Sequence, residues 1–294
     1  MTVDLRVGTR GSALARTQTD LAIQILTEAA RGRGLELRAE VVEIRTAGDE
    51  SQASSFEAIG PKGVFARELQ RALVDGRIDV AVHSLKDLES AEPDGLVIAA
   101  VPPREDPRDV LVSRDGKTLA ELDPGSVVGT SSSRRRALLR LSRPDLDVAP
   151  LRGNVDTRLR KIAGGEVDAG ILAGAGLLRL RRDAEATEWL DPSSFVPAPG
   201  QGALAIEVLA SRADLAFVSA ADDPATRICV ETERAFMRRV ESGCDAPLGA
   251  WARIDGDQLV CTAFVIVDDE GSIATVRGPV DPEAVAADLE RALS

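Results

Sequence analysis

The chain has 294 residues, 44% of them hydrophobic, which suits about two domains with buried cores. Its formal charge of −12 argues against nucleic acid or an anionic membrane as the main partner. The opening stretch MTVDLRVGTRGSALA contains charges and no apolar run of signal-peptide or membrane-span length, so we expect a cytoplasmic protein.

The strand and helix patterns alternate over the first hundred residues. They predict a strand at 5–9, a helix that Ser12 caps and that stops at Gly32, a strand at 35–45, a helix at 64–75 and a strand at 78–84. Residues 46–63 are rich in Gly and Ser and are predicted to form a loop.

The same order of elements then returns. VGTSSSRRRALLR at 128–140 resembles residues 7–16, and GEVDAGILA at 165–173 resembles residues 76–84. The two offsets differ, which excludes a fixed-period repeat and favours two α/β lobes of similar topology around a cleft. Pro-rich stretches mark the chain crossings, and we expect a strand at 203–208 to return to the first lobe.

From about residue 221 the pattern changes. A helix at 224–242, three strands between 249 and 280 and a closing helix from Pro282 predict a small α+β domain. We therefore predict domain 1 at 1–100 and 199–220, domain 2 at 101–198 and domain 3 at 221–294.

Three cysteines, an odd number, argue against a structural disulfide. There is no C-x-x-C spacing, and the single histidine, His83, lies about 160 residues before Cys244, so we expect no metal site. Cys229 and Cys261 lie among apolar residues and are predicted to be buried. Cys244 lies between a glycine and an aspartate and is predicted to be accessible.

Basic residues gather where predicted strands end and helices begin. They are Arg10 beside Ser12, Arg134 to Arg136 after Ser131 to Ser133, Arg152, Arg158 and Arg179. Open α/β sheets bind ligands at such places, and unpaired N–H groups at helix starts favour anions, so the pattern predicts a site for several carboxylates or phosphates. The alternative interpretation is that these arginines cap and solvate their own helices.

The segment VHSLKDL places His83, Lys86 and Asp87 just beyond an apolar strand. A carboxylate there suits a general acid or base, or a group that stabilises a developing cation, although a helix cap is an equally good interpretation of Asp87. His83 is expected to be a packed, hydrogen-bonded imidazole. If Cys244 were a hydrolytic nucleophile it would need a base, and the histidine belongs to an unrelated motif.

Taken in order, nine segments resemble the porphobilinogen deaminase family, also called hydroxymethylbilane synthases. They are VGTRGSALA, GPKGVFARELQRAL, DVAVHSLKDL, REDPRDVLVS, VGTSSSRRR, LRGNVDTRL, AGLLRL, PGQGALAIE and ERAFMRRVESGCDAPLGA. The resemblance implies two periplasmic-binding-protein-like α/β lobes with a small C-terminal α+β domain.

The resemblance also implies an activity. It predicts a monomeric transferase of tetrapyrrole and haem biosynthesis that condenses four porphobilinogen units head to tail, with loss of ammonia. The chain is expected to grow on a dipyrromethane cofactor that Cys244 holds by a thioether bond. Its product, hydroxymethylbilane, would pass to uroporphyrinogen-III synthase.

The family's site residues transfer by motif. The catalytic residues are expected to be Asp87 and Lys86. The cofactor is expected to contact Cys244, Lys86, Asp87, Ser132, Arg134, Arg135, Arg152 and Gly153. Substrate is expected to contact Arg10, Ser12, Lys62, Arg158 and Arg179.

The chain departs from the family pattern in three places. Leu88-Glu89-Ser90 stands where Val-Pro is usual, Ser133 stands where leucine is common, and Gly11 stands where a bulkier residue is frequent. The main alternative is a non-catalytic solute-binding or effector-sensing protein, which would share the two-lobed architecture. That alternative leaves the segment SGCDAPLG unexplained.

Overall fold

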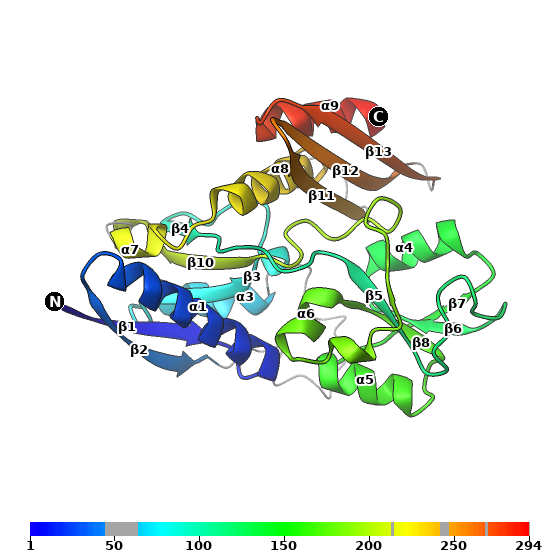
Figure 1. Ribbon diagram of the computed structural model, residues 1–294, viewed down its shortest axis with the longest axis horizontal. Coiled ribbons are helices and arrows are strands. Elements are labelled where there is room, and N and C mark those ends of the chain that lie inside the picture. The colour runs from blue at the N-terminus through cyan, green and yellow to red at the C-terminus, as the bar shows by residue number, and fades with distance from the viewer. Residues whose placement is uncertain (45–63, 213–214, 242–246, 268–269, 294) are drawn as a thin grey trace. The chain divides into compact units, whose positions relative to one another are not determined.

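The computed structural model describes residues 1–44, 64–212, 215–241, 247–267 and 270–293 (Figure 1). The chain forms two compact units. The first contains residues 1–104 and 203–227, and the second contains residues 105–202 and 228–294. Each unit is built around its own sheet or sheets, which are described in turn.

A five-stranded sheet of order β2-β1-β3-β10-β4 forms the centre of the first unit. Its strands are β1 Thr2–Thr9, β2 Glu36–Glu43, β3 Val80–Ser84, β4 Leu96–Ala100 and β10 Leu204–Leu209. Strand β1 is parallel to β2 and β3, whereas β10 is antiparallel to β3 and β4. The predicted return of the chain to the first sheet near residue 203 is therefore confirmed.

Helices cover both faces of this sheet. They are α1 Ala13–Arg31, α3 Val64–Val74, α7 Ala216–Ser219 and two 3₁₀ helices, η2 Leu85–Asp87 and η4 Ala210–Arg212. Neighbouring residues of a strand point to opposite faces. Accordingly Val80 packs in a cluster with Leu26 of α1, and Ala81 packs in a cluster with Leu69 of α3. The predicted start of α1 after Ser12 and its end before Gly32 are confirmed.

The second unit contains a similar sheet, of order β7-β6-β8-β5-β9. Its strands are β5 Asp109–Ser113, β6 Val127–Gly129, β7 Asp147–Ala149, β8 Ala169–Ala173 and β9 Glu188–Trp189. The helices that follow them are α4 Ser133–Ser142, α5 Val155–Ala163, α6 Gly174–Arg179 and the 3₁₀ helix η3 Asp183–Glu185. Strand β6 is parallel to β7 and β8, and β5 is antiparallel to β8 and β9.

Glycine near the end of β1 and at the end of β6 explains the repeated VGT segment. A Cβ on Gly8 would lie 2.3 Å from Ile78 Cδ1, and a Cβ on Gly129 would lie 2.9 Å from Leu151 Cβ. In each unit a core side chain therefore packs directly on the strand backbone, which only glycine permits.

A third, antiparallel sheet of order β11-β12-β13 completes the second unit. Its elements are β11 Leu248–Asp255, β12 Gln258–Val267, β13 Glu270–Gly278, the closing helix α9 Pro282–Leu293, and α8 Pro224–Glu241, which spans the division between the units. Cys229 and Cys261 belong to the core beneath this sheet, as predicted.

This third sheet is bound tightly to the rest of its unit. The fully buried ring of Phe264 packs with Leu138 of α4 and Phe195, in the core of the preceding sheet. The buried carboxylate of Glu233 accepts hydrogen bonds from the backbone N–H groups of Gly200 at 2.7 Å and Ala252 at 2.8 Å. A shared core and a shared buried acceptor explain why the predicted second and third domains form one compact unit.

None of the helices in the described ranges combines the length and the hydrophobicity that a membrane span requires.

Candidate functional site

Four of the predicted site residues lie at one edge of the first sheet. Strand β1 leads into Arg10 and Ser12, and strand β3 leads into Lys86 and Asp87. The two strands are parallel neighbours, with Val7 opposite Val80, so their carboxyl ends meet at the same edge. This edge is where open α/β sheets bind ligands.

Ser12 and Gly11 shape the start of α1 at this edge. Ser12 Oγ accepts a hydrogen bond from Ala15 N at 3.3 Å, which caps the helix and fixes its partial positive charge beside Arg10. A Cβ on Gly11 would lie 2.8 Å from Glu43 Oε1. Glu43 forms an ion pair with Arg16, so the glycine at this unusual position leaves room for that pair.

Asp87 is the last residue of η2, directly beyond β3. Its side chain is exposed, and it makes no hydrogen bond or ion pair with any described residue. The segment is anchored instead by its apolar neighbours Leu85 and Leu88, which are 1% and 5% exposed. Asp87 caps none of the helices described, so the cap interpretation finds no support. Lys86 beside it is half-buried.

The departure at residues 88–90 leaves this anchoring intact. Leu88 fills a buried position, and the exposed carboxylate of Glu89 lies 3.1 Å from Arg67 Nη2. A surface ion pair thus joins this segment to α3, a helix of the same unit.

His83 is a structural residue, as predicted. Its Nε2 lies 3.0 Å from Glu207 Oε2, and both side chains are buried. Gln70 Nε2 donates to the other oxygen of Glu207 at 3.0 Å. The pair joins β3 to β10 next to the segment that carries Lys86 and Asp87. His83 is therefore engaged in packing, and the role of Glu207 was not predicted from the sequence.

The second unit has a matching edge. Strands β6, β7 and β8 are parallel, and their carboxyl ends are followed by the remaining predicted residues. These are Ser132, Arg134 and Arg135 after β6, Arg152, Gly153 and Arg158 after β7, and Arg179 after β8. Strand β5 runs in the opposite direction, so Asp109 at its start faces Ala173 at this same edge.

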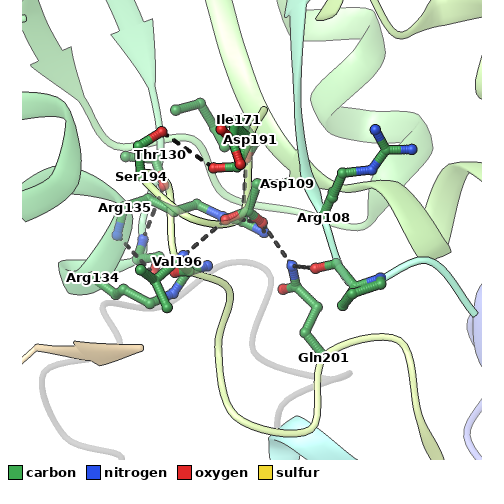
Figure 2. A network of polar contacts seen from close by, with 12 residues as sticks. Arg108, Asp109, Thr130, Arg134, Arg135, Ile171, Asp191, Ser194, Val196 and Gln201 are labelled. Atoms are coloured by element: carbon green, nitrogen blue, oxygen red, sulfur yellow. Dashed lines mark hydrogen bonds and ion pairs between the residues drawn. The ribbon is translucent and has the colours of Figure 1, made fainter. Parts of the chain in front are cut away.

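Figure 2 shows that Arg134 and Arg135 converge on Asp109. Arg135 donates to Asp109 Oδ1 from Nη2 at 2.7 Å and from Nε at 3.1 Å, and Arg134 Nη1 lies 2.8 Å from Oδ2. All three residues are buried, with exposed fractions of 4%, 6% and 0% for Arg134, Arg135 and Asp109. Two positive charges and one negative charge leave this cluster with a net charge of about +1.

Burial alone would raise the pKa of Asp109, but the charges of Arg134 and Arg135 outweigh it and hold the pKa well below its usual range. Burial also lowers the pKa of Arg134, an effect that Asp109 opposes. Each arginine also donates a hydrogen bond to a backbone carbonyl. Arg134 Nη1 donates to Val196 O at 2.6 Å, and Arg135 Nη1 donates to Ile171 O at 2.9 Å. Each guanidinium of the cluster is thus held both by Asp109 and by a backbone carbonyl.

Gln201 extends the same network (Figure 2). Its Nε2 donates to Asp109 Oδ1 at 2.9 Å and to Pro107 O at 2.7 Å. Sequence reasoning missed both Asp109 and Gln201. Their only signal was their presence in the segments REDPRDV and PGQGA, which indicated chain crossings and not a polar cluster.

Gly153 forms a turn that orders the arginines after β7. Its φ is +114°, and a Cβ there would lie 2.7 Å from the Thr157 side chain, so only glycine fits. Arg158 Nε donates to Gly153 O at 2.8 Å, whereas Arg152 is exposed. Asn154 caps α5 by accepting a hydrogen bond from Thr157 N at 2.9 Å.

Arg179 is a further cation at this edge that is only partly satisfied. Its Nη2 donates to Gly202 O at 2.6 Å, but its Nε is buried without a partner, and it forms no ion pair within the described part of the chain. Burial lowers its pKa to about 10, and the nearby charge of Glu105 only partly offsets that effect. A half-buried guanidinium that lacks a carboxylate partner is suited to bind an anion from outside the chain.

Two predicted residues, Lys62 and Cys244, lie outside the described residues. Within those that are described, no group of His, Cys, Asp or Glu side chains is arranged to hold a metal ion.

Basic side chains thus lie at the carboxyl edge of each of the two five-stranded sheets, and Asp87 adds an exposed carboxylate at the first. Residues 5–216 match the family model described as porphobilinogen deaminase, dipyrromethane cofactor binding domain. Residues 227–293 match the porphobilinogen deaminase C-terminal domain. The chain belongs to the porphobilinogen deaminase family of enzymes, which confirms the resemblance of the nine segments.

Individual relatives agree with this assignment. The porphobilinogen deaminase of Acidothermus cellulolyticus is 47% identical over 99% of this chain and 87% of its own length. That of Mycobacterium marinum is 50% identical over 85% of this chain and 77% of its own length. Among solved structures, a Salmonella typhimurium periplasmic binding protein described as specific for arginine is similar with a TM-score of 0.41 and 15% identity, over 76% of this chain and 93% of its own.

Asp109→Asn tests the buried cluster. The substitution leaves two buried guanidinium groups without a counter-charge, so we expect urea denaturation at pH 7 to show a loss of about 3–5 kcal/mol in the free energy of unfolding. Asp145→Asn removes a partly exposed partner of Arg143 and should cost about 1 kcal/mol or less.

The pH dependence has a defined sign. Because the folded pKa of Asp109 is lowered, its contribution to stability is present above its unfolded pKa of about 4 and is lost as the pH falls toward the folded pKa. The difference between wild type and Asp109→Asn should thus be constant from pH 5 to 7 and narrow below pH 4. If the difference in free energy of unfolding between wild type and Asp109→Asn stayed the same below pH 4, it would contradict the lowered pKa of Asp109.

Proposed function

We propose that this enzyme is a hydroxymethylbilane synthase, a transferase that joins four porphobilinogen units head to tail. The observation that carries the proposal is the placement of the cationic residues. In each unit the described motif residues lie at the carboxyl edge of parallel strands, and Arg179 is a half-buried guanidinium with no carboxylate partner among the described residues. The acetate and propionate groups of porphobilinogen would supply such partners.

In the proposed reaction, the aminomethyl carbon–nitrogen bond of each porphobilinogen breaks and ammonia leaves. The resulting methylene carbon bonds to the free α-carbon of the terminal pyrrole, which releases its proton. After four rounds, water would cleave the bond between the tetrapyrrole and the dipyrromethane and supply the hydroxyl group of the released hydroxymethylbilane, while the dipyrromethane would stay on Cys244. When bound, the dipyrromethane supplies the primer pyrrole for the first round.

The residues at the carboxyl edge of the second sheet fit the dipyrromethane cofactor that the matched family domain binds. Its acidic side chains suit Arg152 and the Asp109-oriented pair Arg134 and Arg135, whose cluster keeps a net positive charge. Arginine's planar fork binds carboxylates in a bidentate manner. We propose that Cys244 holds the cofactor by a thioether bond, with Ser132 and Gly153 beside the same pyrroles.

Asp87 is proposed as the catalytic carboxylate, with Lys86 beside it. Its exposed side chain has no partner among the described residues, so its full charge is available to hold pyrrole N–H groups and to stabilise the cation that develops as ammonia leaves. On the same edge, Arg10 and Ser12 are proposed to bind substrate. Lys62, Arg158 and Arg179 complete the proposed substrate contacts.

The finer cellular context is also part of the proposal. We propose a monomeric, cytoplasmic enzyme of tetrapyrrole and haem biosynthesis that takes porphobilinogen as its substrate. Its product would pass to uroporphyrinogen-III synthase. The net charge of −12 agrees with a small-molecule role and not with binding to nucleic acid or to an anionic membrane.

The covalent anchor is tested by intact mass. The purified active protein should exceed its sequence mass by one dipyrromethane, and Cys244→Ser should have the bare mass and no activity. Cys229→Ser, at a buried core position, should keep the adduct. An active wild-type protein with the mass of the bare chain would refute the anchor.

Asp87→Asn is expected to keep the adduct and the fold, because the side chain is exposed and contacts no described residue. Loss of the charge that stabilises the developing cation should lower kcat by at least about 100-fold. Glu89→Gln, two residues away, removes only a surface ion pair and should remain close to wild type. Turnover of Asp87→Asn at the wild-type rate would exclude the proposed role.

A further inference from the structure

A cavity of about 610 Å³ lies in the second unit, between α4 and the third sheet. It begins at the residues on either side of Ser132, at the second cationic edge, and extends along α4. The residues that matter for its chemistry are Ser131, Ser133, Arg136, Arg140, Leu141 and Ile266. A volume of several hundred Å³ suits an organic ligand.

Two positive charges on one side of this cavity have no counter-charge. Arg136 and Arg140 are one helical turn apart, and neither side chain bonds to any described residue. Arg136 Nε is buried and has no hydrogen-bond partner. By contrast, Arg143 at the end of the same helix pairs with Asp145 at 2.6 Å. Like charges at this spacing destabilise a helix, and no acidic residue in the described part of the chain lines the cavity.

The other side of the cavity is apolar. Leu141 is 48% exposed although it lies against the third sheet, and Ile266 is only partly buried. A Cβ on Gly271 would lie 2.3 Å from Leu141 Cδ1, so the glycine lets α4 approach β13 closely at this end. The cavity therefore combines two unpaired cations with an apolar wall, and it matches a flat apolar ligand that carries carboxylates.

We propose that this cavity binds the outer pyrrole rings of the elongating chain through their carboxylates. The inference rests on the proposed function, because each round adds an apolar ring with two carboxylates while the arginines of the edge stay fixed in number. The cavity starts at Ser131 and Ser133, on either side of Ser132 at the carboxyl edge of the second sheet. The cavity thus accommodates the pyrrole rings that the arginines of the second edge no longer hold.

The test compares three variants after a limiting amount of porphobilinogen has been added. Arg136→Gln with Arg140→Gln should load dipyrromethane normally but accumulate complexes with one or two added units, with at least 10-fold fewer complexes of three or four units by intact mass. Arg136→Lys with Arg140→Lys should restore most of the late complexes. Arg160→Gln, which removes an exposed and unpaired charge from α5, should match wild type.

Two further measurements do not depend on turnover. The melting temperature of the double glutamine variant should equal or exceed that of wild type, because a repulsive pair is removed. Hydrogen exchange in wild type should slow across residues 131–141 when three or four units are bound, relative to the protein with dipyrromethane alone.

The outcomes separate this inference from the proposed function. A wild-type protein that carries no adduct and forms no series of enzyme-bound intermediates would overturn the proposed function. A normal series in both wild type and the double glutamine variant would overturn only the cavity's role, as would unchanged exchange at 131–141. If the double glutamine variant has a lower melting temperature than wild type, the double lysine variant provides the test. If that variant is folded but does not form the complexes with three or four added units, the inference is overturned.

Discussion

The structure depends on the cost of burying guanidinium groups at the carboxyl edge of the second sheet. Arg134, Arg135 and Arg179 are all removed from water there to a large extent, and within the described chain Asp109 is the one carboxylate within ion-pair distance of any of them. A buried charge is tolerated only where it is paired or hydrogen-bonded. Asp109 pairs with Arg134 and Arg135, whereas Arg179 donates, among the described residues, only to the carbonyl oxygen of Gly202, and burial lowers its pKa. Arg179 therefore has no carboxylate partner within the described chain, and an acidic pyrrole ligand would supply one.

Because Arg134 and Arg135 also neutralise Asp109, variants of this pair must be interpreted with care. Replacing Arg134 and Arg135 together by leucine would leave Asp109 buried without a partner, so lost activity would report on folding as much as on ligand binding. Asp109 thus positions the pair whose guanidinium groups are proposed to face the ligand. The same reasoning explains why a protein with a net charge of −12 is suited to bind an anion, because local burial and geometry decide the field in the site.

The sequence predicted the elements that are specified by local pattern. The Ser12 cap, the end of α1 and the return of β10 to the first sheet were all visible as period and turn signals. The polar partners were not visible in this way, because Asp109 and Arg135 are 26 residues apart in sequence and His83 and Glu207 are 124 apart. A charged residue in a strand carries no local signal of what it will face. The family resemblance supplied roles for the arginines, but the contacts that orient them came only from the fold.

We propose that the arginines at the carboxyl edge of the second sheet neutralise ligand carboxylates. A crystal structure of the cofactor-loaded protein with porphobilinogen bound tests it most directly. We expect a carboxylate oxygen of a bound pyrrole within hydrogen-bond distance of the Arg179 guanidinium, with Arg134 and Arg135 still held by Asp109. Pyrroles bound with their carboxylates turned to solvent, and Arg179 left with only Gly202 O, would contradict it.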